Sequence, residues 1–375
     1  MESARLMTLV EELARPFVAR REEAMVLVLG LVSREHVLLI GEPGTGKSAL
    51  ARRLASLVDA RFFKYLLTRF TEPSELFGPL DIAGLKEGVY RRITRGKLPE
   101  AEIAFLDEIF NANSAVLNSL LSLLQERIVY DGYSEIRTSI WTVIGASNTI
   151  PEEPELEALY DRFVLRHLVQ PVPAEYWDEL IDRAIVIERE GYEAPRPIVT
   201  LEDIAKAYEE IFKVDLSPVK DKLLKLFMIF EEKGMHTTDR RKGKAAKIIA
   251  AHALIHGRRR ADLADLHVLR YIVPRDIDDF EKVKAILFEE VRTRDKIIQE
   301  LGEIRRSLEA MKPEIKKART YSPRLIDYYK MLNQLSNRIK SMVADVDDEE
   351  LINMASELLD EIQELLSIIS LKLSM

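Results

Sequence analysis

The fold of this chain is decided by the stretch Gly41-Glu42-Pro43-Gly44-Thr45-Gly46-Lys47-Ser48. It fits the pattern Gly-x4-Gly-Lys-Ser/Thr, whose backbone N–H groups wrap the phosphates of a nucleotide. The glycines permit the backbone angles and the close approach that such a loop needs. The lysine offers a point charge to the terminal phosphates, and the serine hydroxyl can ligate Mg2+. The predicted nucleotide-binding set is Gly41, Glu42, Pro43, Gly44, Thr45, Gly46, Lys47, Ser48 and Ala49.

The residues on either side of this loop have the pattern that a phosphate loop requires. Residues 36–40 predict a buried parallel strand, and residues 49–58 predict a helix. The loop therefore leaves a strand and enters a helix, whose positive dipole end favours phosphate. A glycine-rich turn that fits the pattern by chance would not need this context.

The composition sets outer limits on the fold and its surroundings. A chain of 375 residues with 47% apolar residues can form two or three domains with substantial cores. The absence of cysteine excludes disulfides and thiolate metal sites. No apolar run reaches membrane-spanning length and no stretch resembles a secretion signal, so we expect a cytoplasmic protein without a membrane span. The net charge of −8 disfavours nucleic acid as a partner.

A second motif places two carboxylates at the end of an apolar run. Residues 103–106 predict a short buried strand that ends in Asp107 and Glu108. In nucleotide hydrolysis one acid helps to hold Mg2+ and another orients the attacking water. Although adjacent strand residues point in opposite directions, both can reach the site at the end of a strand. An apolar run before Asp-Glu is common, but it becomes a strong signal downstream of a phosphate loop.

Further along, polar residues occur where they could complete this site. Residues 141–146 predict another buried strand, followed by Asn148, which could contact the γ-phosphate or its water or could simply begin the turn before Pro151. Residues 114–126 predict an amphipathic helix with Leu117, Leu120, Leu121 and Leu124 inward. Asp131-Gly132 lies in an alternating stretch and predicts a β-hairpin. Residues 81–84 and 88–92 could pair as another hairpin or form a long surface loop.

Charged and titratable residues outside these motifs have simpler alternatives. Arg162, between large apolar residues, could be an ordinary ion-pair former on a helix surface. Arg240 and Arg241 lie where a helix of the helix-rich region 177–274 begins and could be a solvated charge pair. His252 and His256 have the i,i+4 spacing of metal ligands, but the sequence positions no acid to complete a site, so metal binding is disfavoured.

The C-terminal hundred residues carry apolar residues at steps of three and four in three segments. The segments are separated by 313–323 and by 345–350, which predicts an antiparallel helical bundle or coiled coil. No catalytic constellation is visible in this region. We expect three domains with the boundaries 1–172, 173–274 and 275–375.

The ordered set of motifs resembles the MoxR branch of the AAA+ ATPases, and within it the RavA subgroup. The resemblance covers roughly residues 20–274. It rests on Gly41 to Ser48, Thr68-Arg69-Phe70-Thr71-Glu72-Pro73-Ser74-Glu75-Leu76-Phe77-Gly78-Pro79, Phe105-Leu106-Asp107-Glu108-Ile109, Ala146-Ser147-Asn148 and Leu156-Glu157-Ala158-Leu159-Tyr160-Asp161-Arg162. It implies a three-layer α/β/α core with a parallel sheet and an all-α lid domain. The C-terminal helices predicted above follow these two domains in this chain.

The resemblance also implies roles for single residues. Lys47 matches the Walker A lysine, and Ser48 and Asp107 match Mg2+ ligands. Glu108 matches the Walker B glutamate that polarises water. Asn148 matches sensor 1 and Arg162 an arginine finger offered to a neighbouring subunit. Arg240 matches the sensor 2 arginine, with Arg241 as the alternative because the register rests on a short string.

Proteins of this family are expected to bind ATP or ADP with Mg2+, to form a homo-oligomeric ring that is often hexameric, and to remodel or mature a protein client. Von Willebrand A-domain proteins are the implied partners. One departure concerns RavA, whose C-terminal helices are interrupted by a β-rich, enzyme-binding insertion, whereas helices are predicted throughout 274–375 here. We therefore do not expect that enzyme partner.

Two other functions remain open. A nucleic-acid-translocating motor would be favoured by basic pore hairpins, for example at Arg91 and Arg92, and is disfavoured by the acidic total. An ATP-gated scaffold that does not hydrolyse would need neither Glu108 nor Arg162. The hydrolysing ATPase is therefore the preferred prediction.

Overall fold

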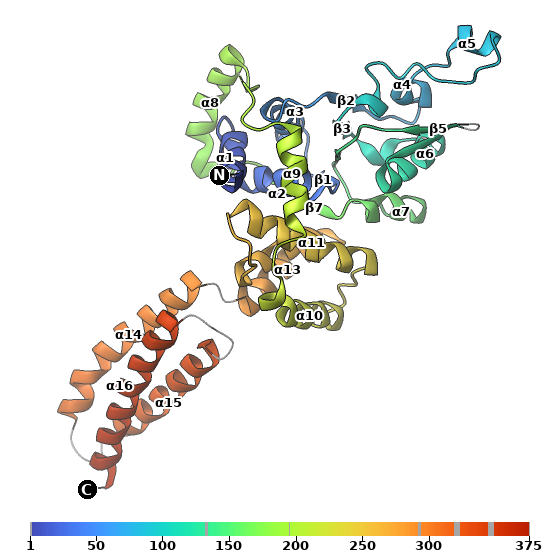
Figure 1. Cartoon of the computed structure of the whole chain (residues 1–375). Helices are drawn as coiled ribbons and strands as arrows, with labels where there is room; N and C mark the ends of the chain where they lie inside the picture. Colours follow the sequence, from blue (N-terminus) through green and yellow to red (C-terminus); the bar gives the residue numbers. More distant parts are fainter. Residues whose placement is uncertain are drawn as a thin grey trace. The chain divides into compact units, whose positions relative to one another are not determined.

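The computed structural model of the chain, shown in Figure 1, describes residues 2–131, 134–194, 196–291, 294–318, 323–343 and 349–374. It contains two compact units, Met1–Leu287 and Phe288–Met375. The first unit contains all the motifs discussed above, and the second is built from the C-terminal helices.

A five-stranded parallel sheet forms the centre of the first unit, with the strand order β2-β3-β6-β1-β7. The phosphate-loop strand β1 therefore lies between β6 and β7. Because the strands are parallel, their carboxyl ends share one edge of the sheet, where ligands of open α/β sheets bind. The strands are β1 (Val37–Ile40), β2 (Phe62–Leu66), β3 (Ile103–Asp107), β6 (Thr142–Ser147) and β7 (Leu165–Leu168).

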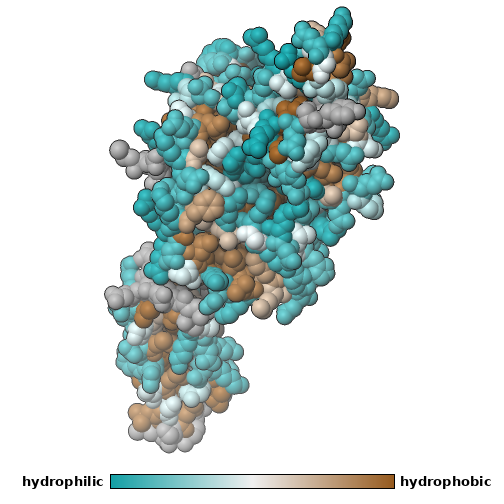
Figure 2. All heavy atoms as spheres, turned by 45° about the vertical axis from the view of Figure 1, so that its right-hand side comes forward, coloured by the Kyte–Doolittle hydropathy of each residue, from teal (hydrophilic) through white to brown (hydrophobic). Residues whose placement is uncertain are grey.

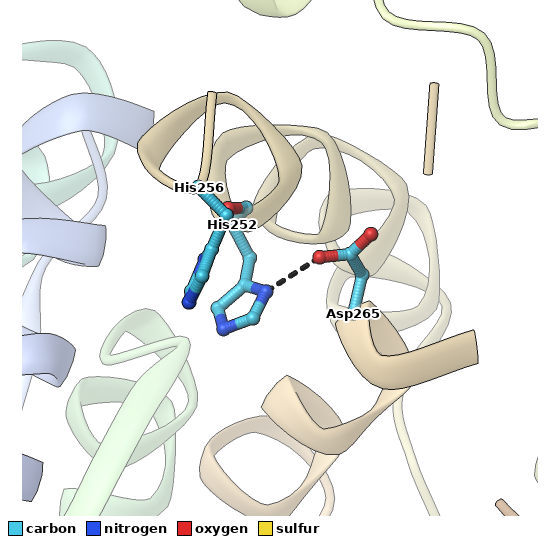
Figure 3. A group of neighbouring side chains, drawn as sticks. All are labelled: His252, His256 and Asp265. Atoms are coloured by element: carbon cyan, nitrogen blue, oxygen red, sulfur yellow. Dashed lines mark hydrogen bonds and ion pairs between the residues drawn. The ribbon is translucent and has the colours of Figure 1, made fainter. Parts of the chain in front are cut away.

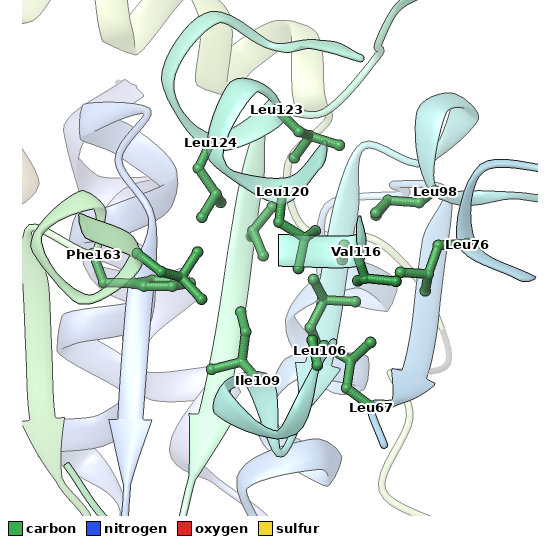
Figure 4. Packing of buried hydrophobic residues seen from close by; sticks show 14 of the residues in the cluster. Leu67, Leu76, Leu98, Leu106, Ile109, Val116, Leu120, Leu123, Leu124 and Phe163 are labelled. Carbon is green, nitrogen blue, oxygen red and sulfur yellow. The ribbon is translucent and has the colours of Figure 1, made fainter. Parts of the chain in front are cut away.

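Helices cover both faces of this sheet, which confirms the predicted three-layer α/β/α arrangement. On one face, α2 packs against β1, β6 and β7, with α1 and α3 beside it. On the other face, α6 lies over the strands and its apolar side chains meet those of β1, β3 and β6 (Figure 4). The helices of this part are α1 (Glu2–Ala14), α2 (Arg21–Ser33), α3 (Lys47–Leu57), α4 (Pro73–Phe77), α5 (Ile82–Lys86), α6 (Ser114–Glu126) and α7 (Pro154–Arg162).

The buried face of α6 differs slightly from its expected face. Val116, Leu120, Leu123 and Leu124 are buried, whereas the flanking leucines of the helix are only half buried. Asn113 begins the helix because its side chain accepts a hydrogen bond from the N–H of Val116. The helix is followed by the small hairpin β4 (Ile128–Asp131) and β5 (Ser134–Arg137), whose strands pair antiparallel as predicted. The Gly132 of the predicted turn lies outside the described residues.

The hairpin expected over 81–92 is wrong in its first arm. Residues Ile82–Lys86 form the short helix α5, and only one antiparallel bridge, Leu80 to Arg92, joins the two arms. The reason is local, since the Asp81 carboxylate accepts hydrogen bonds from the N–H groups of Ala83 and Gly84. This side chain satisfies the first turn of a helix and competes with strand pairing.

The remainder of the first unit is helical, as expected for 177–274. The described residues of 169–291 form no strand beyond an isolated bridge between Asp215 and Arg260. The helix α13 belongs to the first unit, and its Phe280 packs into the same apolar cluster as α6. The helices are α8 (Trp177–Glu190), α9 (Leu201–Ile211), α10 (Ser217–Glu232), α11 (Asp239–Ile255), α12 (Leu269–Ile272) and α13 (Ile277–Glu290).

The second unit is a bundle of three long helices around its own apolar core, which confirms the predicted bundle. They are α14 (Arg294–Lys317), α15 (Pro323–Val343) and α16 (Glu349–Ser374). The contacts Glu300–Arg338 and Glu314–Tyr328 show that α14 and α15 are antiparallel. The ion pairs Arg305–Glu357 and Lys312–Glu361 show that α16 runs parallel to α14, so consecutive helices are antiparallel. The expected break at Pro313 is wrong, because α14 continues past it and buries Ile315 in the core. Burial of that turn outweighs the hydrogen bond that the proline removes.

None of the helices in the described part of the chain combines the length and the apolar character that crossing a bilayer requires.

Candidate functional site: two edges of one sheet

The phosphate loop leaves the carboxyl end of β1 and enters α3. Gly44 and Gly46 have φ values of 82° and 85°, which side chains other than glycine rarely adopt. Gly41 has a different reason, since a Cβ there would lie 2.4 Å from the carbonyl oxygen of Val169. The N–H of Gly41 donates to the carbonyl of Ser147 at 3.0 Å, which ties the loop to the end of β6. The loop is therefore a fixed cradle that ends on the N-terminus of an 11-residue helix.

Lys47 is buried at the base of this cradle. Its Nζ donates to the carbonyl oxygens of Gly41 at 2.7 Å and of Glu42 at 2.8 Å. Burial lowers the pKa of Lys47, and the carboxylates of Asp107 and Glu108 oppose that lowering. The lysine therefore lies within electrostatic reach of both acids, as the sequence predicts. Its ammonium is held by loop carbonyls, which a phosphate could replace as acceptors.

The two carboxylates lie at the end of β3. Asp107 is its last residue, and Glu108 follows in a left-handed conformation with φ 50° and ψ 48°. Such a conformation is unfavourable for a residue with a Cβ and often marks a functional position. Partial burial raises the pKa of the Glu108 carboxyl, the charge of Asp107 raises it further, and Lys47 opposes the rise. Asn111 donates from Nδ2 to the Glu108 carboxylate at 3.4 Å.

The remaining residues predicted for this edge lie where expected. Ser48 and Ala49 are half buried in the first turn of α3. Asn148 is exposed directly after β6, whose last residue, Ser147, is in register with Ile40 of β1. A hydroxyl and a carboxylate are oxygen ligands of the kind that Mg2+ prefers, so Ser48 and Asp107 fit that ion. The carboxyl edge thus brings together the predicted cradle, metal ligands, water-orienting acid and sensor.

Arg162 lies at the opposite edge of the sheet. It ends α7, and the next strand, β7, starts with Leu165 paired with Val37, the first residue of β1. The phosphate loop follows Ile40, at the other end of the same strand. Arg162 therefore cannot serve the cradle of its own chain. Its guanidinium donates to the carbonyls of Leu121 at 3.1 Å and Ala158 at 2.7 Å and to the side chain of Gln125 at 2.8 Å.

Arg240 lies at the same edge as Arg162. It is the second residue of α11 and forms an ion pair with Asp161, at 3.2 Å between Nη1 and Oδ2. Thr238 Oγ1 also donates to Asp161, at 3.0 Å. Burial lowers the pKa of Arg162, and the charge of the nearby Arg240 adds to this. Two cations from different helices are thus held beside each other, and Asp161 was not anticipated as the group that joins them.

The alternative residue for this position, Arg241, is buried inside the unit. Only 2% of it is exposed, and its Nη2 donates to the carbonyl of Pro274 at 3.3 Å. Arg166 donates to the same carbonyl at 3.1 Å and stacks on the ring of Tyr160 at 3.6 Å. Arg241 therefore joins α11 to the segment before α13 through a buried hydrogen bond. The side chain of Arg240, in contrast, is 38% exposed.

The histidine pair on α11 has an acid beside it that the sequence did not place. Asp265 accepts from His252 Nδ1 at 2.6 Å, and His256 Nδ1 lies 2.9 Å from the carbonyl of His252 (Figure 3). Both oxygens of Asp265 are also bonded by Arg258, at 2.6 and 2.7 Å. The carboxylate is therefore occupied as a structural anchor of the 258–265 turn and leaves only two imidazoles for a metal.

Comparisons with known proteins bear on the whole of the first unit. A model described as the MoxR domain in the MoxR-vWA-beta-propeller ternary systems matches residues 4–208, and an AAA lid domain model matches 215–287. The chain is 39% identical over 341 residues to the uncharacterized protein MJ0812 of Methanocaldococcus jannaschii, which covers 90% of this chain and 89% of that protein.

Two further likenesses are more distant. Over 169 residues, or 44% of each chain, the identity to the chaperone MoxR1 of Mycobacterium tuberculosis is 29%. A putative ATPase from Cytophaga hutchinsonii has a solved structure with a TM-score of 0.64 and 20% identity, over 78% of this chain and 94% of that chain. At that identity the likeness shows the fold alone.

Proposed function

Because the chain belongs to the MoxR family of AAA+ ATPases, we propose that it hydrolyses ATP to ADP and phosphate. In this proposal the protein acts as a homo-oligomeric, hexameric ring and uses the energy of hydrolysis to remodel a protein client. The observation that carries the proposal is the convergence of Lys47, Asp107 and Glu108 at the carboxyl edge of the sheet. These are the charge, the metal ligand and the base that phosphoryl transfer to water requires.

Each residue of this edge has a role in the proposal. The backbone of the loop and Lys47 bind the β- and γ-phosphates, and Ser48 and Asp107 would hold Mg2+, which neutralises charge that develops on the phosphates. Glu108 orients the attacking water and takes its proton, and Asn148 fixes the position of that water or of the γ-phosphate. The left-handed backbone conformation of Glu108, which a residue with a Cβ rarely adopts, supports this role.

The opposite edge supplies the cations. Arg162 and Arg240 reach a nucleotide only when it is bound by a neighbouring subunit, because their own cradle lies at the other end of β1. Arg162 acts as the arginine finger and Arg240 as the sensor 2 residue, both in trans. Such a finger can increase the rate by on the order of 10³-fold or more.

A protein client is supported by exposed apolar side chains on the segment between β2 and β3, which are Phe70, Ile82, Leu85, Val89 and Ile93. Phe70 is 90% exposed at the tip of a turn that Asn113 fixes by donating to the carbonyl of Thr71 at 2.7 Å. A von Willebrand A-domain partner follows from the matching family model, and the RavA subgroup remains a narrower proposal. We place the protein in the cytoplasm.

A nucleic-acid motor receives no support from the hairpin arginines. Arg91 forms an ion pair with Asp81 at 2.7 Å, and Arg92 donates to the carbonyl of Gly78 at 2.8 Å, so both are used within the loop. A scaffold that binds ATP without hydrolysis would leave the strained conformation of Glu108 without a purpose.

The test of hydrolysis compares two variants. Lys47→Ala should weaken binding of ATP and ADP, whereas Glu108→Gln should keep binding and lower turnover by about 10²- to 10⁴-fold, the usual contribution of a general base. Nucleotide affinity by calorimetry and phosphate release measure the two effects. Equal loss of binding in both variants would show that Glu108 is structural.

The test of the shared site mixes two inactive proteins. Lys47→Ala subunits lack a cradle and Arg162→Ala subunits lack a finger. At equal amounts, about one interface in four of a closed ring combines an intact cradle with an intact finger. Phosphate release should therefore reappear in the mixture. Its continued absence in rings shown to contain both proteins would refute action in trans.

A further inference from the structure

The helix α8 has an apolar face that its own unit does not cover. None of its 14 residues is buried, although Trp177, Leu180, Ile181, Ala184 and Ile185 follow one face of the helix at steps of three and four. Trp177, Ile181 and Ile185 are each more than half exposed. A single amphipathic helix of this length is only marginally stable in water without a surface to pack on.

The lid offers a surface of matching character. An apolar groove of about 890 Å3 runs between α10 and α11, and we call it the lid groove. Apolar side chains gather on the lower part of the first unit in Figure 2, where α10 lies in Figure 1. The groove is lined by Leu216, Val219, Lys220, Leu223, Leu224, Phe227, Met228, Glu231, Glu232, Lys242, Gly243, Ala246 and Ile249.

The shape of the lid groove suits a helix. On α10, its lining residues recur at steps of three and four along the whole helix. On α11, the small residues Gly243 and Ala246 face it, and a Cβ added at Gly243 would meet no atom within 4 Å. Helix-in-groove recognition uses such an apolar channel to accept the i, i+3, i+4, i+7 face of an amphipathic helix.

Length and charge match α8 to this groove. Helices of 14 and 16 residues are about 21 and 24 Å long at 1.5 Å per residue, so α8 fits along α10. The α8 sequence carries five carboxylates and two arginines. The first nine residues of α10 carry Lys220, Lys222 and Lys225 against the single Asp221, and Lys220 also lines the groove. The end of the groove at the start of α10 is therefore basic, whereas Glu231 and Glu232 line its other end, and the acidic α8 is complementary to the basic end.

The pairing cannot form within one chain. Figure 1 shows α8 at the upper left of the first unit and α10 at its lower end. The segment that follows α8 is held against α3, where Arg53 donates to the carbonyl of Tyr192 at 2.7 Å and Ala194 N–H donates to Ser56. A different copy of the chain must supply the helix.

We propose that the apolar face of α8 docks into the lid groove of a second copy of this chain. The two surfaces differ, so the contact is head-to-tail and repeats around a ring or along a filament. The proposal rests on the oligomer of the proposed function and adds the segments that join its subunits. In such a contact, one subunit holds the lid of the next and links lid position to nucleotide state.

Cysteine cross-linking tests the pairing directly, because the chain has no cysteine of its own. Ile181 lies near the middle of α8 and Leu224 near the middle of α10, so they approach each other whichever way the helices run. Mixing Ile181→Cys protein with Leu224→Cys protein under mild oxidation should give a heterodimer in at least fivefold excess over homodimers. The control pair is Ile181→Cys with Phe212→Cys, because Phe212 is exposed on the lid outside the groove.

Filling the groove provides the second arm. Gly243→Phe places a ring in the lid groove without a clash at Cβ, and it should reduce the cross-link at least tenfold. Gly302→Phe is the matched control, since Gly302 is also helical and unobstructed but lies on α14. Circular dichroism and unfolding midpoints confirm that both variants fold.

Several results would overturn the pairing. Equal cross-linking to Phe212→Cys, a product only between two Ile181→Cys chains, or no effect of Gly243→Phe would each do so. A cross-link that forms only after residues 288–375 are removed would assign the groove to the second unit instead. If mixing of Lys47→Ala and Arg162→Ala subunits restores hydrolysis while the cross-link fails, the shared site stands and only this pairing is wrong.

Discussion

The buried His36 provides a sharp test of the packing next to the phosphate loop. It precedes β1 and is fully enclosed, with Nε2 2.9 Å from the carbonyl of Leu124 and Nδ1 3.0 Å from the N–H of Val143. The first nitrogen must donate and the second must accept, so only one neutral tautomer satisfies both neighbours. Protonation would place a hydrogen on Nδ1 directly against another N–H. The perturbation is acidification, compared between the natural chain and His36→Gln.

The magnitude follows from proton linkage. Burial lowers the pKa of His36 well below its ordinary value of 6.5, and the positive charge of Arg127 lowers it further. Below pH 6.5 the unfolded chain therefore binds a proton that the folded chain excludes. The free energy of unfolding should fall by about 1.4 kcal/mol per pH unit from pH 6.5 down to the depressed pKa of the folded state. Above pH 7 this contribution should not vary.

The assay uses intrinsic fluorescence. Both tryptophans of the chain lie in the first unit, and Trp141 directly precedes β6. In a Trp177→Phe background, urea unfolding followed through Trp141 at a series of pH values reports the unit that contains His36. His36→Gln keeps a donor and an acceptor but cannot be protonated, so it should lose most of the slope below pH 6.5. An identical slope in both proteins would refute the buried neutral tautomer.

Three further outcomes are expected. Glu108→Gln should raise the unfolding temperature of the nucleotide-free protein while it lowers phosphate release. The pKa of the Glu108 carboxyl is raised in the fold, so its negative charge destabilises the fold at neutral pH. A lower unfolding temperature would contradict this. A chain truncated after Leu287 should keep a folded first unit, as followed by tryptophan fluorescence. Truncation after Pro274 removes Phe280 from the core and should lower the free energy of unfolding by about 3–5 kcal/mol. Equal stabilities of the two truncated chains would contradict the placement of α13. Asp161→Ala should change the free energy of unfolding by under about 1 kcal/mol yet reduce the rate of ATP hydrolysis several-fold. An unchanged rate would show that Asp161 does not position Arg240 for the neighbouring subunit.

The parts of the fold that sequence reasoning predicted well are those whose signals are local. The loop at Lys47, the apolar strand before Asp107 and the helix beginning at Ser114 each carry their own pattern of glycines, apolar residues or caps. Their arrangement follows from parallel pairing, which places the ends of β1, β3 and β6 at one edge. The edge that is proposed to bind nucleotide was therefore predictable as a set.

The parts that were missed depend on partners far away in the sequence. The strand β7 reads Leu-Arg-His-Leu, and both of its polar residues are buried. Arg166 donates to the carbonyls of Phe163, Tyr160 and Pro274, and His167 lies 3.7 Å from the carboxylate of Glu23. The choice between Arg240 and Arg241 likewise depends on Asp161, about 80 residues earlier. No periodicity in the local sequence contains that information.

Under the proposed function, the placement of these charged groups makes a single copy chemically incomplete. A parallel strand has two different ends, and here one end of β1 holds the cradle while the other lies beside the cations of α7 and α11. A cation delivered across the sheet of the same chain would have to pass through its apolar core, where an unpaired charge is strongly disfavoured. A neighbouring copy can present the same cation from solvent to the exposed phosphate edge. Hydrolysis would then depend on the contact between subunits. The helix α11 holds Arg240 and also borders the lid groove, so it would take part both in the shared active site and in the proposed docking of α8.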